Sequence, residues 1–331
     1  MTANSLTQFD PDWPSALAEL SGEMHPIDRD ACFIWFQFFP LGLHELLEAT
    51  PDRAGLELFY KFRGSYRLAE IADTSHRFLY GHQYWPAVKH ALQRVPKHET
   101  LLETIRAVAA AVQAPTDLTL PISAIGLMTL RQAGLAFLEH PYTPSAETQT
   151  PEKALRNRAA AVKTNWLSKP KPRIIIDERP PGSWFPLVPG QHITTAAELD
   201  KGPYHETNPR CSPGNGPIPV DCRSGTCGTC WIGILGANEK LAPVEPFERK
   251  RMEYFGYWES PFHTPAAPRP LIRLACQTVA TETCTIVIPP WNGIWSAARR
   301  EAYARRPQTS PIYQSTKTPT ITPPPPDTSI P

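Results

Sequence analysis

Apolar residues repeat at helical spacing through the first part of the chain. The clearest repeat follows Trp85 and places apolar side chains at i, i+3, i+4 and i+7, namely Val88, Ala91, Leu92 and Val95. Pro86 suits a first helical position because no backbone donor is needed there, and Pro96 ends the run. The pattern therefore predicts a helix over residues 85–95.

Neighbouring segments carry the same signal. Thr100 and Glu103 have capping-box spacing, which predicts a helix that stops near Pro115. Its broad apolar face holds Leu101, Leu102, Ile105, Val108, Ala109 and Val112. Further helices are predicted over residues 13–24, 32–49, 53–62 and 122–138. Residues 1–145 are thus expected to form an all-helical domain.

From residue 173 the pattern changes to short β-branched and apolar runs bounded by turn residues. Strands are predicted over residues 173–177, 184–188, 231–235, 271–274 and 283–288, with helices over 195–199 and 245–255. The connection 146–172 is rich in Pro, Thr, Lys and Ala and reads as a linker, with a helix as an option over 152–166. Residues 306–331 are Pro- and Thr-rich and are expected to be disordered. The chain is therefore expected to be α+β, with a second domain over residues 173–291.

Charge and hydropathy narrow the class of partner. The 331 residues include 33 basic and 32 acidic side chains, a net charge of +1 that favours neither nucleic acid nor an anionic membrane surface. The most apolar stretch, residues 31–43, is too short to span a bilayer and contains Gln37 and Pro40. It is expected to be a buried helix, with a peripheral membrane or partner-facing surface as the alternative. The first residues lack a signal-peptide pattern, so a cytoplasmic location is expected.

Cysteine spacing points to a metal centre. Cys222, Cys227 and Cys230 have C-x4-C-x2-C spacing, and Cys276 follows further along the chain. An odd total of seven cysteines, clustered at one locus, favours a metal site in a reduced compartment over a disulfide framework. The other three are assigned structural roles: Cys32 and Cys284 to the core, and Cys211 to the surface as an inert thiol, with a reactive thiol as its alternative.

The region around these cysteines resembles a plant-type [2Fe–2S] ferredoxin domain of the β-grasp fold. The resemblance spans residues 173–289 and rests on Asp-Cys222-Arg-Ser-Gly-Thr-Cys227-Gly-Thr-Cys230, on Arg-Leu-Ala-Cys276-Gln, and on Gly-Ala-Asn-Glu-Lys-Leu-Ala-Pro over residues 236–243. It implies that Cys222 and Cys227 hold one iron, and that Cys230 and Cys276 hold the other. The chain departs from the family pattern in a long stretch before Cys222 and in an apparent insertion around residues 257–270.

The residues of the loop are compatible with such a cluster. Small side chains and two glycines, Gly225 and Gly228, would let the backbone wrap closely and direct N–H groups at the sulfurs. Arg223 is expected to pack over the site or form an ion pair, with a solvated surface arginine as the alternative. Zinc is the alternative metal, although zinc sites usually have C-x2-C pairs at both ends, and here the last cysteine stands alone.

The N-terminal half offers a weaker metal signal. It contains seven of the ten histidines: His25, His44, His76, His82, His90, His98 and His140. His82 and His90 are the most suggestive pair for a second cofactor, but no known haem or metal spacing surrounds them. Most of these histidines are therefore expected to be surface or hydrogen-bonded core residues.

The absence of other motifs favours an electron carrier. There is no G-x-G-x-x-G after a strand, no P-loop and no flavin signature of ferredoxin-fused reductases. The sequence therefore predicts a one-electron transfer protein, with a helical domain that docks a redox partner or a larger complex, rather than a stand-alone enzyme. Two alternatives remain: a redox-enzyme subunit with a substrate or second-cofactor site in the N-terminal half, and a cluster-based redox sensor or scaffold. Residues 171–291 carry 12 basic and 12 acidic side chains, which suits a fixed partner better than a diffusing carrier.

Overall fold

The computed structural model describes residues 3–38, 84–138, 172–176, 184–207, 211–236, 238–255 and 270–288. Several sequence-based expectations lie wholly or largely outside these ranges: residues 39–49 of the helix expected over 32–49, the helix over 53–62, the linker up to residue 171 with its optional helix, the insertion around 257–270, and the tail over 306–331. Within the described ranges the chain is α+β, with helices first and a five-stranded mixed sheet after them.

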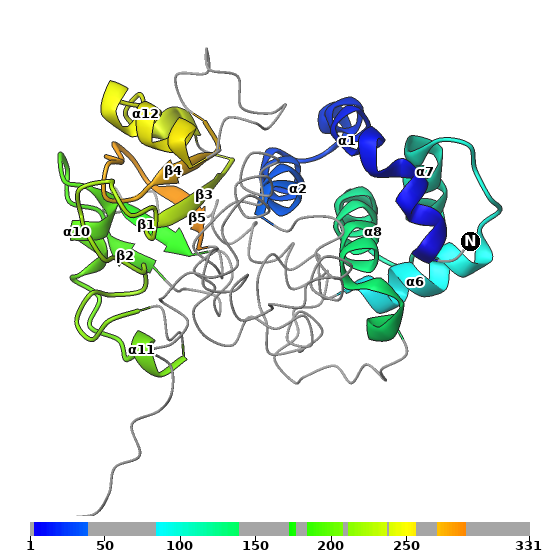
Figure 1. Ribbon diagram of the computed structural model, residues 1–331, viewed down its shortest axis with the longest axis horizontal. Coiled ribbons are helices and arrows are strands. Elements are labelled where there is room, and N and C mark those ends of the chain that lie inside the picture. The colour runs from blue at the N-terminus through cyan, green and yellow to red at the C-terminus, as the bar shows by residue number, and fades with distance from the viewer. Residues whose placement is uncertain are drawn as a thin grey trace, which may run out of the picture.

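The N-terminal part consists of helices (Figure 1). They are η1 (Ala3–Asp12), α1 (Trp13–Leu20), η2 (Ser21–Glu23), α2 (Pro26–Phe38), α6 (Trp85–Arg94), α7 (Leu101–Ala111) and α8 (Thr116–Leu138). Helix α8 contacts α6, α7, α2 and η1, so it is the common packing partner of this part. Its described middle turns, from Ile122 to Leu130, are buried at every position, which explains why α8 lacks a polar face.

The expected starts of α1, α6 and α7 are confirmed, although α1 and α7 end earlier than expected, at Leu20 and Ala111, and the starts of α2 and α8 shift. The capping box is present, since Glu103 N–H donates to Thr100 Oγ1 and Thr100 N–H donates to the Glu103 carboxylate. Helix α2 begins at Pro26 rather than residue 32, because its polar first turn conceals the helical start. Helix α8 begins at Thr116 rather than residue 122 and contains Pro121. A proline there removes only one backbone hydrogen bond near the helix start, and the fully buried Leu118 anchors the first turn.

The second part is a sheet with the strand order β2-β1-β5-β3-β4. The strands are β1 (Arg173–Ile176), β2 (Trp184–Pro186), β3 (Trp231–Leu235), β4 (Ile272–Leu274) and β5 (Cys284–Val287). β1 and β5 are parallel, and the other neighbouring pairs are antiparallel. The short helices are α10 (Ile193–Ala197), α11 (Tyr204–Thr207), η4 (Asn238–Lys240) and α12 (Pro246–Tyr254). All five expected strands and both expected helices of this region are confirmed, whereas α11 falls in a stretch expected to be a loop.

Helix α2 joins the two parts. It lies between the sheet and the other N-terminal helices in Figure 1, and it contacts β3 directly. A Cβ atom at Gly233 would approach Ile34 Cδ1 to 2.7 Å, and one at Gly236 would approach Ile27 Cγ1 to 2.8 Å. Between these contacts, Gly236 N–H donates to Asp30 Oδ2 at 2.8 Å. All five residues of β3 are buried: β4 and β5 pair with its two edges, and α2 packs against the strand.

The apolar stretch that begins at residue 31 is part of this interface. Ala31, Cys32, Ile34 and Trp35 are at most 1% exposed, so the expectation of a buried helix is confirmed for the described residues of the stretch, as is the core assignment of Cys32. In the segments that the structure describes, no helix has the length and apolar content needed to cross a membrane.

Candidate metal centre

Strand pairing brings two of the four cysteines together. Cys230 immediately precedes β3 and Cys276 closely follows β4. In the β3–β4 ladder Trp231 pairs with Leu274, and Ala275 N–H donates to the Cys230 carbonyl at 2.9 Å. Both thiols are buried, and each shifts the pKa of the other: Cys276 raises the pKa of Cys230, and Cys230 lowers the pKa of Cys276.

The other two cysteines lie on a loop that curls over this pair. The Cys222 and Cys227 thiols are only partly buried. Cys227 N–H points at Cys222 Sγ at 3.4 Å, and Thr229 N–H points at Cys227 Sγ at 3.5 Å. Cys276 interacts electrostatically with Cys222, and Cys230 with Cys227. The structure thus gathers all four predicted ligands as two pairs, with backbone donors directed at the sulfurs.

The loop reaches this shape through left-handed backbone conformations. Arg223, Gly225 and Gly228 have φ angles of 55°, 75° and 74°. A Cβ atom at Gly225 would meet Gln277 Cγ and Phe247 Cε1 at 3.1 Å, and one at Gly228 would meet the Phe255 ring at 3.0 Å. Glycine is therefore favoured at 225 and 228 both by the backbone conformation and by the close approach of neighbouring side chains.

The thiol chemistry suits metal binding. Burial raises the pKa of Cys222, but hydrogen bonds from Thr226, Ser224 and Cys227 outweigh it and bring the pKa to about 6. In the buried pair, the hydrogen bond from Cys230 lowers the pKa of Cys276, with Gln277 adding to the effect. The thiolate form that binds metal is therefore favoured at one cysteine of each pair.

Helix α12 holds the cysteine loop through Arg251. Its Nε and Nη2 donate to the carbonyls of Gly225 and Thr226 at 3.3 and 2.6 Å. The guanidinium also lies 4.7 and 4.9 Å from the ring centroids of Tyr254 and Phe255. The loop backbone is thereby fixed to α12 at the residues between the first two cysteines.

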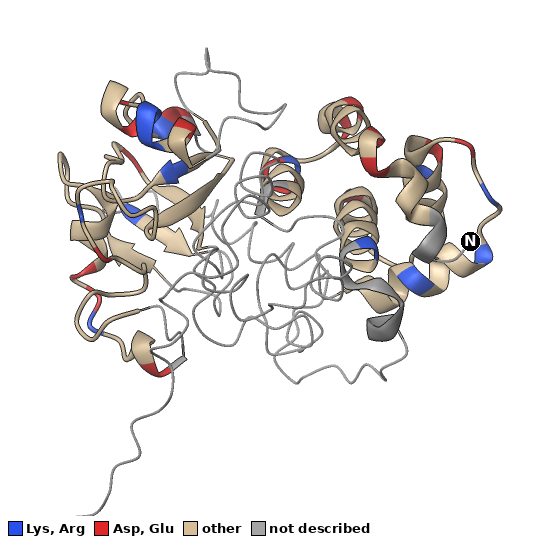
Figure 2. Ribbon diagram, viewed as in Figure 1, with Lys and Arg blue, Asp and Glu red and all other residues tan. Residues whose placement is uncertain are grey.

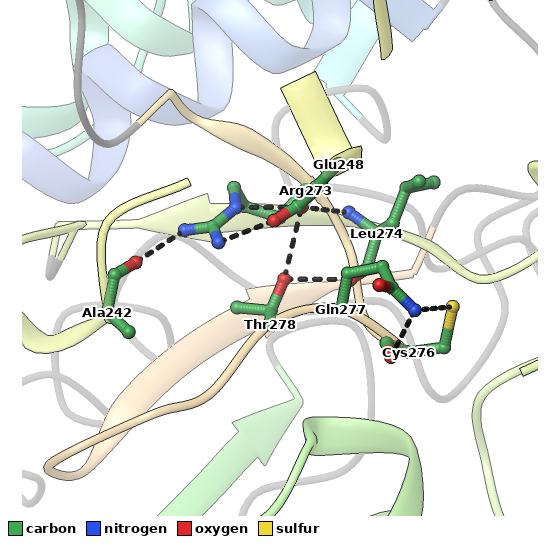
Figure 3. Close-up of polar contacts among 7 residues, drawn as sticks. All are labelled: Ala242, Glu248, Arg273, Leu274, Cys276, Gln277 and Thr278. Atoms are coloured by element: carbon green, nitrogen blue, oxygen red, sulfur yellow. Dashed lines mark hydrogen bonds and ion pairs between the residues drawn. The ribbon is translucent and has the colours of Figure 1, made fainter. Parts of the chain in front are cut away.

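The same helix holds the Cys276 segment through a buried ion pair. Arg273 donates from Nε and Nη2 to the two Glu248 oxygens at 2.9 and 2.7 Å, and both side chains are fully buried (Figure 3). Glu248 also accepts from Leu274 N–H at 3.0 Å and from the Thr278 hydroxyl at 3.4 Å. Arg273 Nη1 donates to the Ala242 carbonyl at 2.9 Å. Each guanidinium nitrogen of Arg273 and each carboxylate oxygen of Glu248 therefore has a hydrogen-bond partner. A buried ion pair needs such complete hydrogen bonding to offset the cost of removing both charges from water.

Two further side chains brace the loop. Arg223 forms an ion pair with Glu198 and donates to Asn215 Oδ1 at 2.9 Å, so the ion-pair expectation for this residue is confirmed. The Thr229 hydroxyl donates to Asp221 Oδ2 at 2.8 Å and links the two ends of the loop. Both contacts keep the cysteine-bearing backbone in one shape.

The cysteines outside the centre are structural. Cys284 is buried in β5 opposite Ile174, which confirms its core assignment, and burial raises its pKa to about 12. The surface assignment of Cys211 is wrong: the residue is 5% exposed, and its thiol lies 3.5 Å from the Pro217 carbonyl. The turns that follow it fold back over the side chain, which a Pro- and Gly-rich sequence alone does not reveal.

Of the suggestive histidine pair, His82 and His90, the structure describes only His90. His25 and His90 are exposed and His98 is half-buried, while His44, His76, His82 and His140 lie outside the described ranges. Among described residues there is no cluster of three or more His, Cys, Asp or Glu side chains placed for a single metal ion. A two-iron cluster does not require one, because each iron takes two protein thiolates and completes its coordination with sulfide.

Sequence reasoning missed the residues that hold the loop. The sequence alone did not predict a role for Glu248, Arg251 or Gln277. Gln277 belongs, with Arg273, to the Arg-Leu-Ala-Cys-Gln motif of the ferredoxin resemblance. The signal in the sequence was that Glu248 shares a helix face with the apolar Met252 and Phe255, at i, i+4 and i+7 spacing. Its distant partner, 25 residues along the chain, has no local signature.

Comparison with protein-family models, with curated proteins and with solved structures finds no match to this chain. The assignment of the centre therefore rests on the four thiols, the loop conformation and the directed N–H groups.

Proposed function

We propose that this protein transfers single electrons through a plant-type [2Fe–2S] cluster held by Cys222, Cys227, Cys230 and Cys276. The observation that carries the proposal is the convergence of these four thiols as two pairs on a loop whose N–H groups point at sulfur. The strand order, with β1 and β5 parallel at the centre, supports assignment of this part to the β-grasp ferredoxins.

The four cysteines suit a [2Fe–2S] cluster in their chemistry as well as in their arrangement. Four thiolates form a soft, negatively charged donor set that suits iron and sulfide. When bound, the cluster supplies a site that gains and loses one electron. The chain contributes the N–H donors that offset the negative charge and the α12 contacts that keep the ligands in place.

The burial of the cysteines suggests a route for the electron. Cys230 and Cys276 are buried beneath the loop, whereas Cys222 and Cys227 are partly exposed. A redox partner would therefore approach the side that carries Cys222 and Cys227. Helix α12 beside it carries both positive and negative side chains (Figure 2), which fits the neutral balance expected for a partner held in a fixed position.

The helical part would hold this sheet within a larger redox complex. Because α2 packs on β3 through close glycine contacts, the helices are joined to the strand that follows Cys230. Such an arrangement suits a component of an assembly better than a freely diffusing carrier. Co-purification from native extract should identify the partner, and recovery of the chain alone in both redox states would contradict this part of the proposal.

Anaerobic reconstitution tests the proposed cofactor. The protein should bind iron and sulfide in equal amounts, two of each per chain. It should also show broad visible absorption and a rhombic EPR signal after reduction. Cys276→Ser should abolish these properties, whereas Cys211→Ser, another buried thiol of the same part of the chain, should keep them. Binding of zinc without sulfide would contradict the proposal.

A further inference from the structure

We propose, on the basis of the function proposed above, that Gln277 is a positioning residue whose side-chain amide raises the reduction potential of the centre. The residue follows Cys276 directly, and its backbone N–H donates to the Leu274 carbonyl at 2.8 Å. That bond turns the chain after the cysteine and directs the side chain back over the cysteine loop.

The amide of Gln277 is surrounded by acceptors. Its Nε2 lies 3.4 Å from Cys276 Sγ, 2.8 Å from the Cys276 carbonyl and 3.5 Å from the Arg223 carbonyl (Figure 3 shows the first two). Because all three neighbours are acceptors, the NH2 group and not the amide oxygen must face them. One donor group is therefore shared between a ligand sulfur and the backbone of both cysteine segments.

The side chain is also packed in place. A Cβ atom at Gly225 would lie 3.1 Å from Gln277 Cγ and 3.2 Å from its Cδ, so the stem of the glutamine rests on the loop backbone. Arg223 follows Cys222, so the amide spans from the last predicted ligand to the segment of the first. This contact leaves the amide little freedom to turn away from Cys276.

The direction of the effect follows from charge. A hydrogen bond to a ligand sulfur withdraws negative charge, and reduction adds one electron to the centre. The N–H···S contact therefore stabilises the reduced state more than the oxidised state and raises the potential, as hydrogen bonds to cluster sulfurs generally do. Unlike the backbone donors at Cys227 and Thr229, this donor can be removed by substitution without changing the main chain.

Substitution of Gln277 tests the inference. Gln277→Met keeps the length of the side chain and removes the donor, and Gln277→Glu replaces the donor with a negative charge. In an EPR-monitored redox titration we expect the Met variant to be harder to reduce by about tenfold in the equilibrium ratio, about 59 mV for one electron. The Glu variant should shift further in the same direction. Gln93→Met, an exposed substitution on α6, should leave the potential unchanged.

Each outcome decides the inference. An unchanged potential in a Met or Glu variant that retains its cluster overturns it while leaving the electron-transfer function intact. If both variants lose the cluster, pulsed EPR on the reduced unsubstituted protein, with 15N in the glutamine side chains, decides: a 15N coupling supports the inference and its absence overturns it. An unsubstituted protein that binds no iron and sulfide overturns the proposed function and the inference together.

Discussion

At the scale of single residues, the cysteine loop depends on backbone conformations that side chains resist. Gly225 and Gly228 have positive φ angles and also lie against neighbouring side chains. Gly190 has a similar φ angle of 76°, but no atom lies within 4 Å of its hypothetical Cβ. Alanine substitutions at these glycines can therefore separate the cost of a side chain at positive φ from the cost of a close contact made by its Cβ.

We expect Gly228→Ala to weaken retention of the proposed cluster. The new Cβ would approach the Phe255 ring to 3.0 Å, in addition to a left-handed strain of about 1–2 kcal/mol. Gly190→Ala carries the strain alone, so it should lower the free energy of unfolding by that amount and leave the cluster in place. Release of iron at rising temperature, followed by visible absorbance, measures the difference, and equal release from the two variants would contradict the packing argument.

Reactivity of the metal-free protein tests the ionisation of Cys222. With a pKa of about 6, its thiolate fraction should rise between about pH 5 and pH 7 and then level off. Alkylation by iodoacetamide, located by mass spectrometry, should follow this curve at Cys222. Cys284, whose pKa burial raises to about 12, should stay unreacted over the same range. An alkylation rate at Cys222 that is still rising at pH 8 would show that the hydrogen bonds do not lower its pKa.

At the scale of elements, α12 connects the two segments that carry the cysteines. Arg251 holds the loop between Cys222 and Cys227, and Glu248 holds the segment that leads to Cys276. The two residues are three apart and lie on neighbouring positions of the helix. A single short helix therefore fixes the separation of ligands that are distant in sequence.

Breaking the buried pair should destabilise the protein strongly. Glu248→Gln leaves the fully buried Arg273 charge without a counter-ion, which costs about 3–5 kcal/mol. Glu23→Gln removes the partner of Arg106, where both side chains are about half exposed, and should cost less than about 1 kcal/mol. Urea unfolding followed by circular dichroism measures both changes. Similar losses in the two variants would mean that the buried pair has no special role.

At the scale of the whole molecule, the helices and the sheet share one interface. Ile27, Asp30 and Ile34 lie on one face of α2 and contact β3 and its end at Gly233 and Gly236. Buried aromatic and aliphatic side chains on both sides of this contact belong to one continuous cluster. The two parts are therefore expected to unfold together.

Gly233→Ala tests this coupling. The added methyl group would lie 2.6 Å from Val287 Cγ1 and 2.7 Å from Ile34 Cδ1, so we expect a loss of about 1–3 kcal/mol. Unfolding monitored by helix content and by cluster absorbance should coincide in the unsubstituted protein, and both transitions should shift to lower temperature in the variant. Gly22→Ala, where no atom lies within 4 Å, is the control and should shift neither. Separate transitions in the unsubstituted protein would contradict the shared interface.

Local patterns predicted most of the elements because their causes are local. The capping box at Thr100, the apolar spacing in α6 and the β-branched run of β1 all act over a few neighbouring residues. Two helix starts were predicted too late along the chain. In α8 the rule that a proline interrupts a helix did not hold, because Pro121 lies inside the helix. In α2 the polar first turn concealed the start at Pro26. Burial of Cys211 was missed because turns that follow the residue cover it.

The sequence by itself determined the class of the chain, the order of its elements and the four thiols that form the candidate centre, because spacing and composition are properties of neighbours along the chain. Only the tertiary structure decided which side of those thiols is exposed and which residues hold them in place. Glu248 meets Arg273, Gln277 meets the loop at Gly225, and α2 meets β3 across 206 residues between Asp30 and Gly236. Such contacts depend on the packing of distant segments, and no local pattern of residue types encodes them.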